Sequence, residues 1–156
     1  MRAMVLAAIV LAACRGGARP ATAPTPGSDS AGLTRLVAAQ LDRSASDWNR
    51  GDLDAFLSDY APESTTTFID GRRAREGMAF IRGNYAPRFE PGARRDSLHF
   101  EELRVRGLSP TLALVTARFI LQRGSEVTAS GPFTLVMERR AEGWRILHDH
   151  SSSDPR

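Results

Sequence analysis

Two histidines near the end of the sequence are the side chains best suited to chemistry. His148 and His150 lie one residue apart in the segment 144–151, which is expected to be a β-strand. Because alternate side chains of a strand share a face, both imidazoles should share the face of Trp144. An imidazole can donate, accept or shuttle a proton near neutral pH. The two histidines are therefore candidate acid–base groups, unless they only bond to neighbouring strands and shape the fold.

Arg118 is the second polar candidate. It lies in the middle of an expected strand, residues 112–123, where an unpaired buried charge would be strongly unfavourable. It must therefore either form an ion pair, with Glu101, Glu102 or Glu138 on neighbouring strands, or face a polar cavity. In a cavity shared with the two histidines, its guanidinium would suit an anionic or carboxylate-bearing small molecule, because it can form bidentate hydrogen bonds.

Metal and cofactor sites are not expected. His148 and His150 could share a metal ion, but no cysteine or convincing carboxylate accompanies them. The sequence also lacks a phosphate-binding loop, a dinucleotide-binding glycine motif and a nucleophile elbow. Asp70 could act as a general base if it were desolvated beside its substrate. An Asp-Gly pair also makes a turn, however, and the turn is the preferred interpretation.

Large apolar and aromatic side chains are candidates for the walls of a ligand pocket, although each is more typical of a hydrophobic core. They are Trp48, Tyr60, Phe68, Met78, Tyr85 and Phe133.

The N-terminus predicts export and lipidation. Arg2 precedes a ten-residue apolar run, residues 4–13, which is shorter than the roughly 20 residues of a membrane-spanning helix and fits a signal peptide. The sequence Leu-Ala-Ala-Cys that ends at Cys14 resembles the lipobox of bacterial lipoproteins. We therefore expect residues 1–13 to be removed and Cys14 to carry the lipid. The alternative is an ordinary secretory signal with an incidental cysteine.

Cys14 is the only cysteine, so the chain cannot form an internal disulfide bond. Acylation would protect this thiol, and two or more acyl chains would anchor the protein stably to a membrane. By analogy with lipoproteins, Arg15 in place of Asp favours the outer membrane of a cell that has two membranes. We therefore expect a membrane-anchored protein of the cell envelope.

The charge distribution argues against nucleic acid as a partner. The sequence contains no lysine, and removal of residues 1–13 leaves 20 arginines against 18 acidic residues. The arginines are interleaved with acids and form no basic stripe.

One folded domain is expected over residues 31–153, after a tether, residues 14–30, that is rich in Pro, Gly, Ala and Thr. Apolar spacing predicts helices over residues 31–49, 53–60 and 73–85, and strands over residues 65–69, 98–106, 112–123, 127–140 and 144–151. Helices followed by a run of antiparallel strands indicate an α+β fold.

Three segments resemble nuclear transport factor 2-like, or SnoaL-like, domains over about residues 31–153. They are NRGDLD with YAPE (residues 49–54 and 60–63), VTARF (residues 115–119) and GWRILHDHSS (residues 143–152). The resemblance implies a cone-shaped, strongly curved antiparallel sheet packed on three N-terminal helices, with a pocket at its wide end. In isomerase and cyclase members of this family a carboxylate inside the cone abstracts a proton. No acid of this sequence could be matched to it, so that activity does not transfer.

The resemblance also implies a homodimer that forms through the outer face of the sheet. Residues 112–123 agree with this, because both of their alternating faces are substantially apolar.

The leading hypothesis is a membrane-tethered domain that binds a small, partly apolar molecule. Arg118, His148 and His150 would supply polar contacts, and Trp48, Tyr60, Tyr85 and Phe133 the walls. An isomerase, dehydratase or hydrolase that uses His148 or His150 as acid–base is one alternative. A structural oligomerisation module of the cell envelope is the other.

Overall fold

The computed structural model describes residues 30–70 and 73–155. Cys14 and the expected tether up to residue 29 lie outside these residues, so lipidation and localisation stay predictions. No helix in the described part of the chain is long and apolar enough to cross a membrane.

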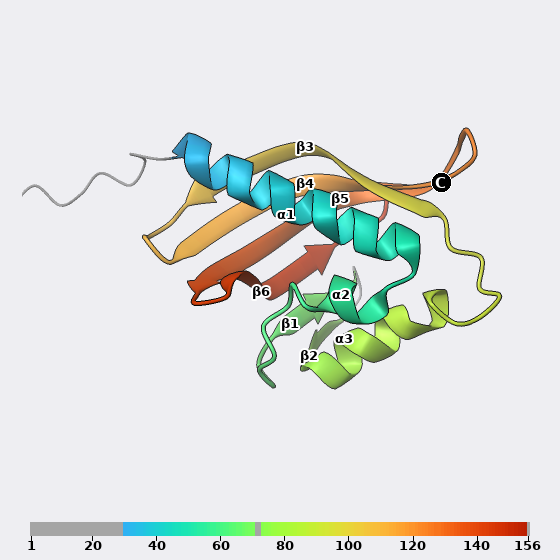
Figure 1. Ribbon diagram of the computed structural model, residues 1–156, viewed down its shortest axis with the longest axis horizontal. Helices are drawn as coiled ribbons and strands as arrows, with labels where there is room; N and C mark the ends of the chain where they lie inside the picture. Colours follow the sequence, from blue (N-terminus) through green and yellow to red (C-terminus); the bar gives the residue numbers. More distant parts are fainter. Residues whose placement is uncertain (1–29, 71–72, 156) are drawn as a thin grey trace, which may run out of the picture.

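A six-stranded curved sheet and three helices form the domain (Figure 1). The helices are α1 (Ser30–Arg50), α2 (Leu53–Leu57) and α3 (Met78–Tyr85), which a short 3-10 turn, Ala86–Arg88, follows. The strands are β1 (Thr67–Ile69), β2 (Ala74–Glu76), β3 (Ser97–Gly107), β4 (Leu112–Arg123), β5 (Glu126–Arg140) and β6 (Gly143–Ser151). Their order in the sheet is β2-β1-β6-β5-β4-β3, and every neighbouring pair is antiparallel except β1 with β6. The expected α+β fold is confirmed.

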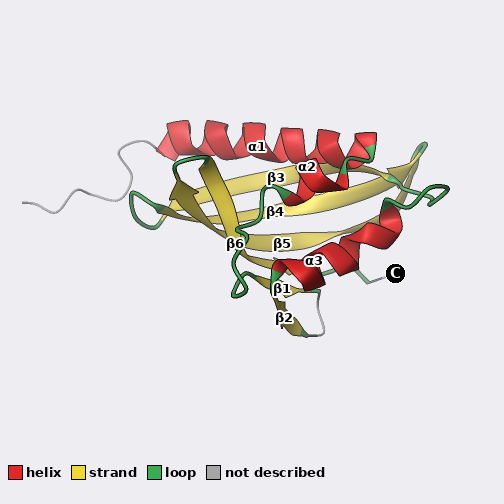
Figure 2. Ribbon diagram, turned by 60° about the horizontal axis from the view of Figure 1, so that its bottom comes forward, coloured by secondary structure: helices red, strands yellow, loops and turns green. Residues whose placement is uncertain are grey.

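Helix α1 lies along β3 (Figure 2) and contacts it with its apolar stripe. Val37, Leu41 and Trp48 recur at helical spacing and are all buried, so they share one side of the helix. Gly51, at φ +80°, lets the chain leave the helix. Asp52 then caps α2 by accepting a 3.0 Å hydrogen bond from the backbone N–H of Ala55.

The segment expected as one helix over residues 73–85 is instead an edge strand followed by a shorter helix. Ala74–Glu76 pairs with β1, and Gly77 has φ +86°, a conformation that interrupts a helix. The backbone N–H of Gly77 donates to the carbonyl of Thr66 at 2.9 Å. Pairing with β1 therefore outweighs the helical spacing, and α3 begins at Met78.

The second helix also ends earlier than expected, at Leu57, and Tyr60 lies outside it. Tyr60 forms an isolated parallel bridge with Ile146 of β6. The backbone N–H of Ile146 donates to the Asp59 carbonyl at 2.8 Å, and that of Ala61 donates to the Ile146 carbonyl at 2.9 Å. The chain after α2 is thus bonded to the edge of β6, which fixes Tyr60 beside that strand.

The hydrophobic core lies between the helices and the inner face of the sheet. On β4, Ala113, Val115 and Ala117 point inward and are buried, as the period-two reading of this strand predicts. Phe119 and Leu121 line the inner cavity, so by alternation Leu114 and Ile120 lie on the opposite, outer face. This apolar outer face is compatible with the expected dimer, which stays a prediction.

Strand β6 contains a β-bulge that reverses its alternation. In its pairing with β5, Ile146 lies opposite Met137 and His148 lies opposite Val136, so Leu147 has no partner. Trp144 and Ile146 are buried before the bulge, and Asp149 is buried after it. Because a bulge adds one residue to a strand, the inward positions change from even to odd numbers at Leu147.

Deletion of Leu147 should be tolerated. The shortened β6 would pair continuously with β5 and would keep Asp149 on the inner face. We expect the free energy of unfolding to fall by roughly 1–2 kcal/mol, measured by urea denaturation.

The matched control is deletion of Thr134, which has partners on both sides, Thr116 and His150. This deletion reverses the alternation of half of β5 and should prevent folding. If the two deletions lowered the free energy of unfolding equally, the assignment of Leu147 as the extra residue would be contradicted.

Candidate functional site

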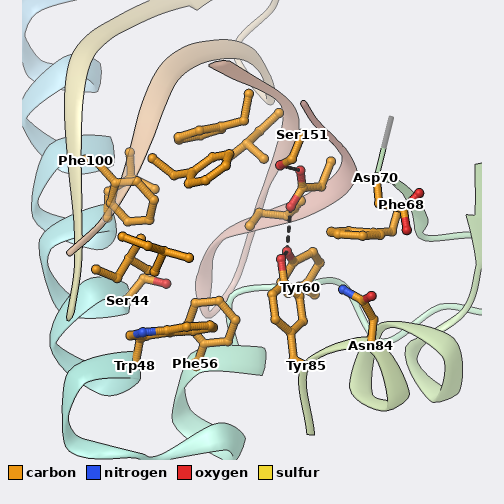
Figure 3. Close-up of a pocket in the computed structure, with 18 of the residues that line it drawn as sticks. Ser44, Trp48, Phe56, Tyr60, Phe68, Asp70, Asn84, Tyr85, Phe100 and Ser151 are labelled. Carbon is orange, nitrogen blue, oxygen red and sulfur yellow. Dashed lines mark hydrogen bonds between the residues drawn. The ribbon is translucent and has the colours of Figure 1, made fainter. Parts of the chain in front are cut away.

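A cavity of about 370 Å³ lies between the inner face of the sheet and the helices. Its walls are largely aromatic side chains that come from α1, α2, α3 and four strands, and Figure 3 shows several of them around the open space. The aromatic residues that line it are Trp48, Phe56, Tyr60, Phe68, Tyr85, Phe100, Phe119 and Phe133. Many of the rings meet edge to face, as do Trp48 and Phe56 at a centroid distance of 5.4 Å, an arrangement that stabilises aromatic clusters.

One buried carboxyl group lies among these rings. Asp149 accepts a 2.6 Å hydrogen bond from the hydroxyl of Tyr60 and a 2.9 Å hydrogen bond from that of Ser151. The hydroxyls of Tyr60 and Tyr85 are 3.3 Å apart and lie side by side in Figure 3. When Asp149 is ionised, Tyr60 gives its only proton to that carboxylate, and Tyr85 is then the donor between the two tyrosines.

Burial shifts the pKa values of this cluster. Desolvation raises the pKa of Asp149 above its ordinary value, although the hydrogen bonds from Tyr60 and Ser151 oppose the shift. Burial, together with the negative charge of Asp149, also raises the pKa values of Tyr60 and Tyr85. The tyrosines therefore stay protonated at neutral pH, and Asp149 holds its proton more tightly than an exposed aspartate does.

A buried polar contact between α1 and β6 holds Tyr60 in place. The side-chain amide of Gln40 donates to Asp59 at 3.0 Å and to the carbonyl of Trp144 at 3.1 Å. Arg43 forms an ion pair with the same carboxylate of Asp59. Asp59 directly precedes Tyr60, so these bonds fix the hydroxyl of Tyr60 relative to Asp149.

Polar side chains line the cavity near solvent. They are Asp70, Asn84, Arg88, Ser152 and Ser153, of which Asp70, Arg88 and Ser153 are exposed. Asp70 follows β1 directly and lies on the side of Phe68 in Figure 3. It is exposed and thus lacks the desolvation that a general base requires.

The structure places neither His148 nor His150 in the cavity lining. His148 is half-buried, and its Nδ1 lies 2.5 Å from the hydroxyl oxygen of Thr67, whereas His150 is exposed. The expectation that both histidines share the inward face of Trp144 is therefore wrong, because the bulge at Leu147 reverses the strand.

Arg118 also lies outside the cavity lining. It forms an ion pair with Asp154, and its Nε lies 4.0 Å from Glu102. Of the two expectations for this arginine, the structure shows the ion pair, with Asp154 as an additional and closer partner.

Most of the aromatic candidates lie in the cavity wall, unlike His148, His150 and Arg118. Trp48, Tyr60, Phe68, Tyr85 and Phe133 all line the cavity, whereas Met78 packs against the core without lining it.

Sequence reasoning missed Asp149 and Ser151. The signal that could have located them is the adjacent apolar pair Ile146-Leu147, which breaks strict alternation within β6. Such a break is what a bulge requires, and counting onward from it places Asp149 inward.

A family model described as a SnoaL-like domain matches residues 37–155 of the chain. No curated protein matches the sequence. Among solved structures, a nuclear transport factor 2-like protein of unknown function from Shewanella oneidensis is 28% identical, with 77% of this chain and 98% of that chain covered and a TM-score of 0.66.

Two more distant structures share the fold. A protein with a cystatin-like fold from Nostoc punctiforme is 13% identical, with 80% and 91% of the two chains covered and a TM-score of 0.63. A candidate dehydratase of the nuclear transport factor 2-like family from Streptomyces avermitilis is 18% identical, with 81% and 99% covered and a TM-score of 0.64. At these identities the likeness shows the fold alone.

Asp149→Asn should become more stable relative to the wild type as the pH rises from about 3 to about 8. The raised pKa of Asp149 means that its contribution to stability is full below the ordinary carboxyl pKa and is lost as the pH rises through the raised value. The Asn variant has no such loss. Thermal unfolding of both proteins across this range measures the difference.

Asp154→Asn is the control of opposite sign. Hydrogen bonds from Ser130 and Arg118 lower the pKa of Asp154, so the wild type gains stability from this group as the pH rises. The Asn variant should therefore fall behind the wild type over the same range. The same trend in both variants would contradict the assigned shifts.

Proposed function

The chain belongs to the SnoaL-like domain family, and on that premise we propose that it binds a small aromatic molecule inside its cone. The observation that carries the proposal is the cavity itself, in which aromatic walls surround one buried carboxyl group and its hydroxyl partners. Such a site combines apolar contact area with a single point of polar recognition.

The polar cluster favours a ligand with a neutral hydrogen-bond donor. Asp149 can accept a bond from a hydroxyl or an N–H group, whereas a second carboxylate beside it would be repelled in this buried setting. Among the described residues that line the cavity, Arg88 alone is basic, and it is exposed. A carboxylate on the ligand, if present, would therefore lie near Arg88 and away from Asp149. This revises the polar contacts first expected from Arg118 and the two histidines.

Enzymatic acid–base chemistry is the second candidate, and the buried carboxyl group favours it. A buried carboxyl group whose pKa lies above its ordinary value holds its proton more tightly than an exposed one, and it is therefore a better candidate for proton transfer. Because both histidines face away from the cavity, this role would fall to Asp149, with Tyr60 and Tyr85 as hydrogen-bond donors. The related structure from Streptomyces avermitilis is described as a candidate dehydratase.

We also propose that Cys14 carries the lipid that tethers this domain to a membrane of the cell envelope. The support is the lipobox-like sequence that ends at this cysteine and its place as the only thiol of the chain. The tether would hold the binding domain in the envelope and would take no part in its chemistry.

The ligand proposal predicts a rank order among three probes of the same size class. For the chain carrying Cys14→Ser, 2-naphthol should bind about fivefold more tightly than naphthalene, because one hydrogen bond contributes about 1 kcal/mol. The anion 2-naphthoate should bind more weakly than 2-naphthol, because Asp149 repels it. Isothermal titration calorimetry measures all three.

Asp149→Asn should bring 2-naphthoate closer in affinity to 2-naphthol, since the repelling charge is gone. Asp70→Asn, which removes an exposed carboxylate near the opening, is the matched control and should leave the order unchanged. If none of the three probes binds, the proposed function is contradicted. Chemical conversion of a bound compound by the wild type but not by Asp149→Asn would identify the enzyme instead.

Replacement of Cys14 by Ser should release the protein from membranes and leave the domain folded. Membrane fractionation measures the first effect, and the thermal unfolding of the purified protein measures the second. Ser28→Cys in the Cys14→Ser chain is the control, since a thiol without the preceding Leu-Ala-Ala sequence should not restore attachment. If the Cys14→Ser protein still fractionated with membranes, the proposed lipid anchor would be contradicted.

A further inference from the structure

The chain beyond β6 continues along β5 and forms part of the cavity wall. The backbone N–H of Ser152 donates to the Pro132 carbonyl at 3.0 Å, and that of Asp154 donates to the Ser130 carbonyl at 2.8 Å. Ser152 and Ser153 line the cavity. We call residues 152–154 the strap. It begins directly after Ser151, whose hydroxyl bonds to Asp149, so it adjoins the polar cluster of the site.

Strand β5 has a glycine where the strap packs against it. A Cβ atom at Gly131 would lie 1.8 Å from the carbonyl oxygen of Ser152 and 2.8 Å from its carbonyl carbon. No side chain larger than hydrogen fits there while the strap is in place. The next residue, Pro132, has no N–H group and can therefore only accept from the strap. Both backbone hydrogen bonds given above are donated by the strap.

The far end of the strap is fastened by side chains. Asp154 forms an ion pair with Arg118 of β4, and the hydroxyl of Ser130 donates to the same carboxylate oxygen at 2.6 Å. Arg118 lies on the outer face of the sheet, between the inward-facing Ala117 and Phe119. The side chains of Arg118 and Asp154 keep 27% and 36% of their surface exposed, so the pair is partly open to solvent.

These attachments are few compared with those of the other walls. The remaining lining residues stand mainly on helices and on strands that pair along their length, whereas the strap is held by two backbone hydrogen bonds, the hydrogen bond from the Ser130 hydroxyl and one partly exposed ion pair. Segments with few buried contacts open locally at a low free energy, well before the domain unfolds. The strap is therefore the part of the wall best able to move.

We propose that the strap is the wall through which the ligand enters and leaves, and that Arg118, Ser130 and Asp154 are positioning residues that hold it closed. This inference rests on the proposed ligand binding in the same cavity. It gives Arg118 a role in binding without contact to the ligand, and it explains the glycine at position 131.

The test compares Arg118→Met with the wild type, both as the full chain carrying Cys14→Ser. Hydrogen exchange of the Ser152 and Asp154 amides reports on the strap without any ligand. Stopped-flow dissociation of 2-naphthol reports on passage. Both rates should rise about fivefold, the factor that corresponds to an ion pair of ~1 kcal/mol. Arg118→Lys should bring both rates most of the way back to the wild-type values, because it keeps the positive charge.

Arg123→Met is the matched control, since it removes an ion pair with Asp96 from the same strand, away from the strap. It should leave both rates unchanged. Unchanged exchange of the strap amides in Arg118→Met would show that the ion pair does not hold the strap. Faster exchange with unchanged dissociation would show that the ligand leaves by another route. Each of these results overturns the inference.

Failure of 2-naphthol to bind the wild type contradicts the proposed function, and the strap then has no ligand to admit. In that case the exchange measurement still decides whether Arg118 holds the strap, so the two failures remain distinguishable.

Discussion

The hydrogen bond from the Tyr60 hydroxyl to Asp149 joins two segments that are 89 residues apart in the chain. A carboxyl group buried among aromatic rings is tolerated only where donors satisfy it, and Tyr60 and Ser151 supply them here. Other contacts of the interior hold the two partners of this hydrogen bond in position. Gln40 and Arg43 fix Asp59 beside Tyr60, the bridge to Ile146 fixes the backbone there, and the bulge at Leu147 turns Asp149 inward.

Local sequence patterns were sufficient for most of the fold. The apolar stripe of α1 and the long strands β3 to β6 follow from spacing, because their burial is dictated by a period of 3.6 or of two residues. The aromatic walls could also be found in this way, since Trp48, Tyr60, Tyr85 and Phe133 line the cavity. The errors lie where a distant segment overrides the local pattern. Gly77 and β1 convert the expected start of α3 into a strand.

Whether the polar residues of the site could be predicted depended on a single position in β6, the extra residue Leu147. Period-two counting is correct from Trp144 to Ile146 and wrong beyond Leu147, where the extra residue exchanges the two faces. As a result, His148 and His150 lie on the outer face and Asp149 lies on the inner face, the reverse of the prediction. A site that was expected to present imidazoles instead presents a carboxyl group with a raised pKa and tyrosine donors, so the acid–base chemistry open to it is that of a buried acid.

The parallel pairing of β1 with β6 has a consequence for the order of folding. Thr67 and His148, which meet across these strands, are 81 residues apart, whereas the hairpins from β3 to β6 join neighbours in the chain. Loop closure over such a distance is slow compared with hairpin formation. The hairpins from β3 to β6 and α1 are therefore expected to associate first, and the polar centre forms only when the segment from Tyr60 to β1 docks onto β6. Until that docking occurs, Asp149 lacks its hydrogen bond from Tyr60, so a partly folded chain would hold much of its apolar interior without a complete recognition site, and the parallel pairing acts as a checkpoint for a finished, usable domain.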